Sequence, residues 1–546
     1  MKKKILFLCV VFSALLVTSC VKDLDVKPKN PNTILSGNLN DDPAYMEQVM
    51  AKIYASFIIA GQGANGGADI SAPDENFFTT MRAFWNLQEL PTDEAICAWG
   101  DVGIADLNTQ TWSSSNPFLT AVYQRLGLSI TYANDFIRLT KDNTDPAVMR
   151  YHAEARFLRA LAYYWYLDLF GNPPFTTEDD LVGNFFPSQL DPNFDIARTK
   201  LFNYIASEVI SIEDQLGEPG FSYPHADKGA AWMLLSKLYL NAEVYTGTAK
   251  WDSALIYTNK VISSGAYALE SNYRKNFGAD NGRDGGNQEM IFAWAQDGTN
   301  IQGYVGTTFI IESSSDAVYL RAEDFHGLTS NTNWNGNRAT KHFLNVMIDT
   351  LATYSGNPVP WDTDPFFTQS NDKRVYLRVK QRPDIPSASS SGDYGIGVYK
   401  FTARLAGDDV TPSSNPAYAD TDFPIFRYAD AILMRAEAAY RTGDVAGAVA
   451  DINRIRERAF GDASGNITAD QLDDRFLLDE RGREFYYEAQ RRTDMIRLGQ
   501  FTGGTYTWAW KGGVFNGTQT SSHLRVYPIP SEEVAANPNI EQNPGY

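Results

Sequence analysis

Apolar residues recur at helical spacing through much of the chain, and this periodicity limits the possible folds more than any other feature. In the segment 147–170 two apolar stripes run side by side, which predicts a helix buried on most of its circumference. One stripe consists of Phe157, Leu161 and Tyr164, and the other of Leu158, Ala162, Trp165 and Leu169. Long helices are expected over the ranges 44–59, 118–139, 147–170, 196–216, 228–245 and 251–263.

Several of the expected helices form pairs joined by a short turn that contains glycine. One pair covers 232–262 with its turn at Gly247, and another covers 432–458 with its turn at Gly443. Small residues such as Ala448 let paired helices approach closely, and the second pair resembles a tetratricopeptide unit. Because the pairs are unevenly spaced along the chain, we expect separate helix pairs within one scaffold and not a continuous solenoid.

The composition changes over residues 265–425 to Gly, Asn, Ser and Asp with short hydrophobic runs. The stretches 280–287 and 387–397 are typical of this texture, which predicts long loops with short strands. Long loops on a helical scaffold usually serve recognition. The expected fold is therefore mainly α, with a tetratricopeptide-like helix-pair scaffold and a loop-rich, short-stranded ligand-binding lobe.

The first twenty residues have the pattern of a signal peptide that ends at a cysteine. Three lysines precede an apolar run over residues 5–17, which is too short to remain as a membrane-spanning helix. The following residues up to Cys20 resemble a bacterial lipobox, in which the cysteine is acylated; the alternative is an incidental thiol beyond an ordinary cleavage site. We therefore expect export, a lipid anchor on Cys20, and a polar, proline-bearing tether over 21–43.

Charge and cysteine content exclude several classes of protein. The net charge of −19 makes nucleic acid an improbable partner. Cys9 leaves with the signal and Cys20 would carry lipid, so Cys97 has no disulfide partner. No base lies beside Cys97 in the sequence, and we expect it to be a small buried hydrophobe and not a nucleophile.

No sequence motif predicts a catalytic, metal or cofactor site. The segment 61–66 matches G-x-G-x-x-G, but it follows a helix instead of a strand and is expected to be a loop. The five histidines are isolated and lack zinc-ligand spacing. Glu480, Glu484 and Glu488 could serve a glycosidase, yet arginines interleave with them, which favours paired charges on a helix.

Aromatic residues give the better indication of a binding site, because sugar rings stack their C–H faces on flat side chains. One group lies in an early Gly/Asp-rich region and another in the later loops. For each tryptophan, core packing and ligand stacking are equally compatible with the sequence. The candidates are Phe77, Phe78, Phe84, Trp85, Trp99 and Trp112 in the first group, and Trp294, Tyr304 and Trp334 in the second.

Taken together, several blocks resemble the SusD/RagB-like nutrient-binding lipoproteins of Bacteroidetes outer membranes. The resemblance extends over nearly the whole chain. The blocks are Ala153-Glu154-Ala155-Arg156-Phe157-Leu158-Arg159-Ala160, Gly171-Asn172-Pro173-Pro174, Arg427-Tyr428-Ala429-Asp430, Glu480-Arg481-Gly482-Arg483-Glu484-Phe485, Arg491-Arg492-Thr493-Asp494-Met495-Ile496-Arg497, Tyr527-Pro528-Ile529-Pro530 and Gln542-Asn543-Pro544-Gly545-Tyr546.

The resemblance implies a non-catalytic, surface-exposed glycan-binding protein of the outer membrane. Such a protein covers a SusC-like TonB-dependent transporter and delivers oligosaccharide or polysaccharide to it. The resemblance also implies helix-pair repeats against the transporter and a ligand on the opposite, loop-rich face. It divides the chain into an N-terminal SusD-like region, 44–264, and a C-terminal region, 265–546, with a loop-rich part, 265–425, and a helical part, 426–546.

By similarity, Trp99 and Trp334 lie near the places where relatives put stacking aromatics. We expect Trp85, Trp99 and Trp334 to stack on the ligand, and Arg82 and Asp101 to form hydrogen bonds with it. Further ligand-binding candidates are Trp112, Trp294 and Tyr304.

Three alternatives to a glycan-binding module stay open. One is a glycan-degrading lipoprotein, a glycoside hydrolase that uses two of the many carboxylates. Another is a peptide-binding member of the same family. The third is an envelope scaffold whose helix pairs hold other proteins, for which removing the loop aromatics would leave every ligand-dependent measurement unchanged.

Overall fold

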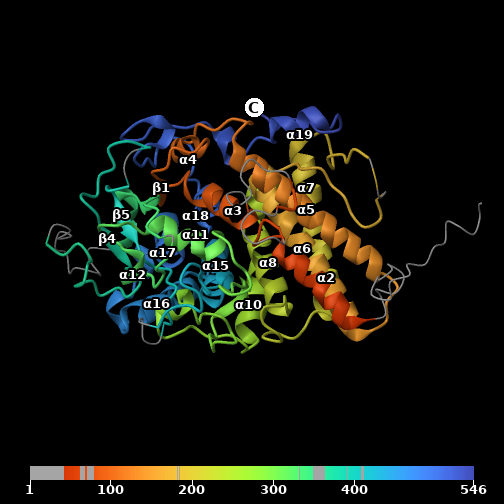
Figure 1. The fold of residues 1–546 in the computed structure, drawn as a ribbon, viewed down its shortest axis with the longest axis horizontal. Coiled ribbons are helices and arrows are strands. Elements are labelled where there is room, and N and C mark those ends of the chain that lie inside the picture. Colours follow the sequence, from red (N-terminus) through yellow and green to blue (C-terminus); the bar gives the residue numbers. More distant parts are fainter. Residues whose placement is uncertain are drawn as a thin grey trace, which may run out of the picture.

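Helices dominate the computed structural model, which describes residues 42–61, 68–70, 79–180, 183, 185–330, 332–348, 363–389, 392–406 and 411–546 (Figure 1). The prediction of a mainly α fold is confirmed. The helices are α2 (Pro43–Ala55), α3 (Thr80–Glu89), α4 (Ile104–Thr109), α5 (Pro117–Thr140), α6 (Pro146–Phe170), α7 (Phe194–Ile212), α8 (Lys228–Leu240), α9 (Ala242–Thr246), α10 (Trp251–Ser263), α11 (Gly306–Ser314), α12 (Ala322–Phe325), α13 (Lys341–Met347), α15 (Tyr428–Thr442), α16 (Val445–Phe460), α17 (Asp474–Phe485), α18 (Arg491–Arg497) and α19 (Ser531–Ala536).

The helix α6 is the centre of the core, as its two apolar stripes predict. Asp145 accepts hydrogen bonds from the first turn through its side chain, and Pro146 occupies the position where a missing N–H does no harm. The helix ends at Gly171, whose φ is +72°. A β-carbon there would lie 2.6 Å from the Phe194 ring, so only glycine fits this close approach to α7.

The long helices form one row in space although a long insertion interrupts them in the sequence. Along this row α5 packs on α6, α6 on α7, α7 on α8, α8 on α10, α10 on α15 and α15 on α16. The insertion between α10 and α15 is the loop-rich part of the chain. Ala448 is fully buried where α16 packs on α15. The prediction of helix pairs within one scaffold is confirmed. The pairs lie next to one another in space, although they are unevenly spaced in the sequence.

Within the described residues, short strands form two small sheets beside this row. An antiparallel sheet has the order β1-β3-β5-β4, and a second sheet pairs β2 with β6. The first sheet joins the early part of the chain to the loop-rich part, because β1 pairs with β3. The strands are β1 (Ala95–Cys97), β2 (Met290–Trp294), β3 (Asn337–Ala339), β4 (Leu377–Val379), β5 (Ile396–Val398) and β6 (Phe423–Arg427).

Two features of the fold differ from the sequence-based expectation. The helix α3 was not predicted: it is only ten residues long, and its polar side chains, Arg82, Asn86 and Glu89 among them, are buried together with its apolar ones. The part 265–425 holds α11, α12 and α13 in addition to loops and strands. The helix α11 is also buried along its whole length, although its sequence contains polar residues such as Thr308 and Glu312.

Some predicted features lie outside the described residues. These are the signal peptide, the tether up to residue 41, the acylation candidate Cys20, the aromatics Phe77 and Phe78, and the segment 62–66 of the glycine motif. Among the described residues, no helix is both long enough and apolar enough to cross a membrane.

Candidate functional site

Four aromatic rings from separate loops form a continuous surface, which we call the aromatic arc: Trp99, Trp334, Tyr304 and Tyr418. The ring centroids of Trp99 and Trp334 lie 6.2 Å apart with planes inclined by 50°. Tyr304 follows at 5.5 Å from Trp334 with an inclination of 68°, and Tyr418 at 5.3 Å from Tyr304 with 44°. Because each ring is tilted relative to the next, the arc follows a curve.

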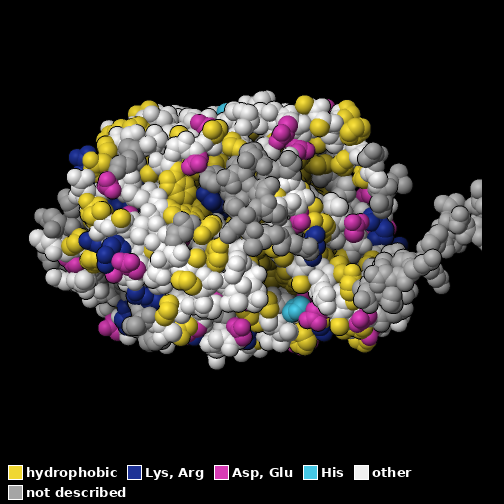
Figure 2. Space-filling view, in the orientation of Figure 1, with side chains coloured by type: hydrophobic (Ala, Val, Ile, Leu, Met, Phe, Trp, Pro, Cys, Tyr) yellow, Lys and Arg dark blue, Asp and Glu magenta, His cyan; other side chains and the backbone are white. Residues whose placement is uncertain are grey.

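The rings of the arc are partly packed against the protein and partly exposed to solvent. Trp99, Trp334 and Tyr304 are half-buried, whereas Tyr418 is only 8% exposed. Trp99 and Trp334 both pack against the hydrophobic core. Figure 2 shows hydrophobic side chains gathered over the region that β1 and α11 occupy in Figure 1. β1 ends two residues before Trp99, and α11 begins two residues after Tyr304.

Strand pairing brings the two tryptophans together. In the antiparallel register Cys97 lies opposite Asn337, so residues just after β1 lie opposite residues just before β3. The Trp99 indole N–H donates to the carbonyl oxygen of Trp334 at 3.0 Å, which fixes the ring. Gly336 lets the indole lie against the backbone, since a β-carbon at this position would be 2.3 Å from Cε2 of Trp99.

Arg82 lies beneath the arc and not at its rim. Its guanidinium carbon is 4.5 Å from the ring centroid of Phe309 in α11 and 5.5 Å from that of Trp99. The side chain is 5% exposed. We therefore assign Arg82 a cation–π contact that supports the indole, whereas the sequence-based expectation was a hydrogen bond with the ligand.

Polar side chains lie beside the arc. Asp101, predicted from the sequence, is exposed and follows Trp99 by two residues. Lys380 donates to Oδ1 of Asn335 at 3.0 Å, and Asn335 donates to Oδ1 of Asp393 at 3.4 Å. Lys380 and Asp393 were not predicted, because segments far from Trp334 in the sequence supply them and no local motif marks them.

The other tryptophans in the predicted site are core residues. Trp85 is fully buried in α3 and donates its indole N–H to the carbonyl oxygen of Tyr487 at 3.1 Å. Trp294 is 1% exposed and stacks on Phe57 with a centroid distance of 4.7 Å. Trp112 is 4% exposed and donates to the hydroxyl of Tyr546. Burial keeps all three from a ligand in solvent, so the expected stacking role is corrected for each.

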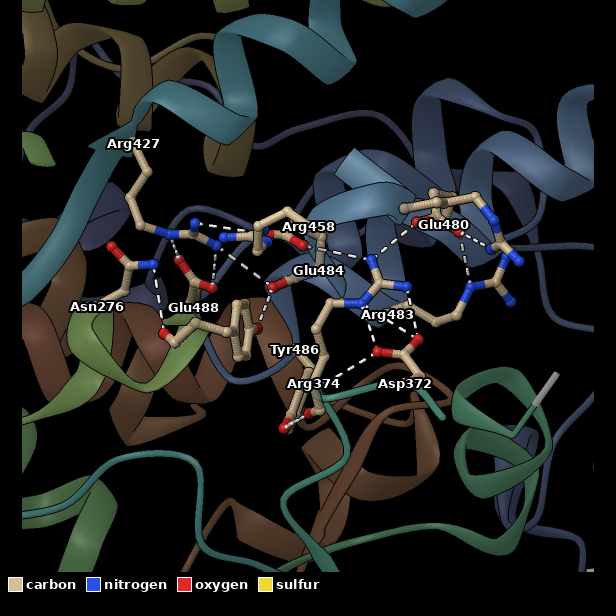
Figure 3. A network of polar contacts seen from close by, with 12 residues as sticks. Asn276, Asp372, Arg374, Arg427, Arg458, Glu480, Arg483, Glu484, Tyr486 and Glu488 are labelled. Carbon is tan, nitrogen blue, oxygen red and sulfur yellow. Dashed lines mark hydrogen bonds and ion pairs between the residues drawn. The ribbon is translucent and has the colours of Figure 1, made fainter. Parts of the chain in front are cut away.

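The three glutamates that could serve a glycosidase lie in a buried network of charges (Figure 3). The prediction that arginines pair with them is confirmed, but most partners come from other elements and not from the same helix. Glu480 contacts Arg374, Arg456 and Arg483 at 2.7–2.9 Å. Glu484 contacts Arg374, Arg427 and Arg458 at 2.6–3.3 Å, and Glu488 contacts Lys400 and Arg427 at 2.6–2.8 Å.

This network holds the loop-rich part on the helices and is unsuited to acid–base chemistry. The arginines around Glu484 outweigh its burial and lower its pKa to about 2, and the pKa of Glu480 is lowered well below its ordinary value. A general acid needs a proton near neutral pH, so neither carboxyl group can supply one. Arg374 and Lys400 come from the loop-rich part, whereas Glu480 and Glu484 lie in α17 and Glu488 follows it.

Neither Cys97 nor a metal cluster offers another reactive site. Burial raises the pKa of the Cys97 thiol to about 12, which confirms that this cysteine is a buried hydrophobe. Within the part of the chain that the structure describes, no group of three or more His, Cys, Asp and Glu side chains is arranged to hold a metal ion.

Comparison with known proteins decides the family. A model of the SusD family matches residues 262–546. The starch-binding protein SusD of Bacteroides thetaiotaomicron is 36% identical over 556 residues, covering 97% of this chain and 96% of that protein. The chain belongs to the SusD family. The resemblance found in the sequence blocks is thus confirmed, and a SusD-like protein of Formosa agariphila, P25, is 24% identical over 80% of this chain and 79% of its own.

Solved structures agree with the SusD fold. A SusD superfamily protein from Parabacteroides distasonis aligns with a TM-score of 0.67 at 20% identity, covering 94% of this chain and 100% of that chain. Surface glycan-binding protein A from Bacteroides fluxus aligns with a TM-score of 0.66 at 19% identity, covering 92% and 99%. At these identities the likeness supports the fold alone.

Proposed function

We propose that this chain is a surface lipoprotein that binds oligosaccharide or polysaccharide on the aromatic arc and passes it to a SusC-like TonB-dependent transporter. The observation that carries the proposal is the arc itself. Three half-buried rings, Trp99, Trp334 and Tyr304, lie within 6.2 Å of their neighbours, and the two tryptophans pack against the hydrophobic core. Preformed aromatic surfaces of this kind stack on the C–H faces of sugars without catalysis.

The shape of the arc favours a curved glycan. Successive ring planes are inclined by 44–68°, so a straight chain cannot stack on every ring. A bent chain such as an α-linked glucan can follow them. The printed name of the relative that is 36% identical, a starch-binding protein, supports the same class. We therefore propose starch-like α-glucans as the first ligands to test.

Stacking with few charged contacts suits a protein that must release its ligand. An aromatic contact contributes about 0.5–1.5 kcal/mol beyond its buried area, so a few such contacts give modest affinity. Tight binding would slow the transfer of the glycan into a transporter. Anchoring through acylated Cys20 would keep the binding site at the outer membrane surface, near this partner.

The proposal is tested with the mature chain, residues 21–546, on a panel of polysaccharides that includes amylopectin. Affinity gel electrophoresis measures binding, and the same mixtures are assayed for new reducing ends. Trp99→Ala and Trp334→Ala remove arc rings. Phe186→Ala is the control, because this side chain is 58% exposed and does not belong to the arc.

We expect amylopectin to retard the mature chain and the Phe186→Ala variant, but not the two arc variants, with no new reducing ends. Release of sugar would contradict the non-catalytic role and favour a glycoside hydrolase. Absence of retardation by every polysaccharide would contradict glycan binding and lead to tests of peptides and of the scaffold role.

A further inference from the structure

The backbone is strained at both residues that flank Trp334. Asn333 has a φ of +68° and Asn335 a φ of +52°, so both lie in the left-handed region. Asparagine tolerates this region better than other residues with side chains, but a pair of such residues persists only where the surroundings hold it. The strain therefore indicates that other contacts maintain the bend formed by residues 333–336, which carries Trp334.

The end of α11 supplies those contacts. Consecutive backbone N–H groups of the bend donate to residues at the end of this helix, and most of the acceptors are backbone carbonyls. The bonds are Asn333 N–H to Oε2 of Glu312 at 3.1 Å and to Oγ of Ser315 at 3.0 Å, Trp334 N–H to the Glu312 carbonyl at 3.1 Å, Asn335 N–H to the Ser315 carbonyl at 2.8 Å, and Gly336 N–H to the Ser313 carbonyl at 2.8 Å.

Glu312 has an environment that suits a neutral hydrogen-bonding group. Its side chain is fully buried, and Oε2 also accepts from the Ser315 hydroxyl at 3.3 Å. Among the described residues, no atom forms a hydrogen bond with Oε1. Burial raises the pKa of Glu312 to about 8, which keeps the carboxyl group largely protonated at neutral pH.

We propose that Glu312 is a positioning residue of the aromatic arc: by accepting the Asn333 N–H, its carboxyl group holds the bend that presents Trp334. The role in ligand binding rests on the proposed function, whereas the position of the ring does not. A glutamine at this position keeps an acceptor oxygen of the same reach. An alanine removes this acceptor, so that Oγ of Ser315 remains the only acceptor for the Asn333 N–H among those described above.

The test uses the mature chain with 5-fluorotryptophan and compares three variants by fluorine NMR without any ligand. Glu312→Ala removes the acceptor and Glu312→Gln preserves it. Ser314→Ala is the matched control, because it removes a buried hydroxyl from the same helix that makes no hydrogen bond with the bend. The signal of Trp334 is assigned by its loss in Trp334→Phe.

We expect Glu312→Ala to shift or broaden the Trp334 signal, while Glu312→Gln and Ser314→Ala leave it in place. Affinity for amylopectin should fall roughly two- to tenfold in Glu312→Ala only, since one ring contact is misplaced. An unchanged Trp334 signal in folded Glu312→Ala would overturn the positioning role. Failure of every form to bind glycan would count against the proposed function, and the fluorine signals would still decide the role of Glu312.

A pH series separates this role from a purely structural one. The Trp334 signal of the wild-type chain should change with a midpoint near pH 8, and that of Glu312→Gln should lack this step. Other charged groups nearby are common to both forms, so the difference isolates Glu312. On the elements that pack against α11 they are Arg82 and Glu89 of α3 and Arg338 of β3, and just after the end of α11 they are Asp316 and its partner Lys380.

If Glu312→Ala does not fold, the pH series still tests the positioning role of Glu312. In that case Ser315→Ala removes the other side-chain acceptor of the Asn333 N–H, and it should shift the Trp334 signal. Identical pH profiles for the wild-type chain and Glu312→Gln, together with an unshifted signal in Ser315→Ala, would overturn the proposal.

Discussion

Gly336→Ala is the sharpest single perturbation of the arc. A methyl group at this position would lie 2.3 Å from Cε2 and 2.4 Å from Cζ2 of Trp99. Carbon atoms in contact prefer about 3.5–4.0 Å, so the indole must move by about 1 Å or more. That shift breaks the 3.0 Å bond from the Trp99 indole to the Trp334 carbonyl. The φ of Gly336 is not positive, so the effect comes from the clash alone.

Gly336→Ala should lower both the free energy of unfolding and the affinity for glycan. Overpacking should lower the free energy of unfolding by about 1–3 kcal/mol, and the lost hydrogen bond should add about 1 kcal/mol. Displacement of one stacking ring should weaken binding of maltoheptaose by roughly two- to tenfold. Urea unfolding measures the first effect and titration calorimetry the second.

Gly100→Ala is the matched control for this experiment. It adds the same methyl group one residue after Trp99, where no atom lies within 4 Å of the added carbon. We expect its stability and affinity to match those of the wild-type chain. Wild-type affinity in folded Gly336→Ala would refute the claim that a fixed Trp99 ring carries binding.

Three further predictions concern the scaffold. Glu484→Gln should lower the free energy of unfolding by about 3–5 kcal/mol in urea titrations, because it leaves buried arginines without their counter-charge. The pKa values of Asp93, Glu484 and Asp494 are each lowered to about 2. Their stabilisation is complete above the unfolded-state values near pH 4 and is lost as the pH falls toward 2, so these three groups should make the free energy of unfolding decline over that range. Cys97 in the mature Cys20→Ser chain should react with a thiol reagent only after unfolding; rapid reaction of the native chain would contradict its burial.

The sequence predicted the helical scaffold well, because its periodicity is a local property. The segment 147–170 corresponds to α6, Pro146–Phe170, with a difference of one residue at its start. The helix α3 was not predicted because it is only ten residues long and its polar residues are buried along with its apolar ones. Helices of this kind depend on neighbours from distant parts of the chain, and the local sequence does not reveal those neighbours.

The site was predictable only in part. The aromatic residues of the arc and of the core are of the same types, and their exposure is decided by partners far away in the sequence. Trp99 meets Trp334 because β1 pairs with β3, a register that no local pattern specifies. The same dependence placed Trp85 in the core and brought the unpredicted Tyr418 to the arc.

A crystal structure of the mature chain with bound maltoheptaose tests the central claim most directly. We predict that glucosyl rings stack on Trp99, Trp334 and Tyr304, with the oligosaccharide bent along the arc. Ordered sugar at any other surface, with these three rings left in solvent, would contradict the claim that the arc is the glycan-binding site.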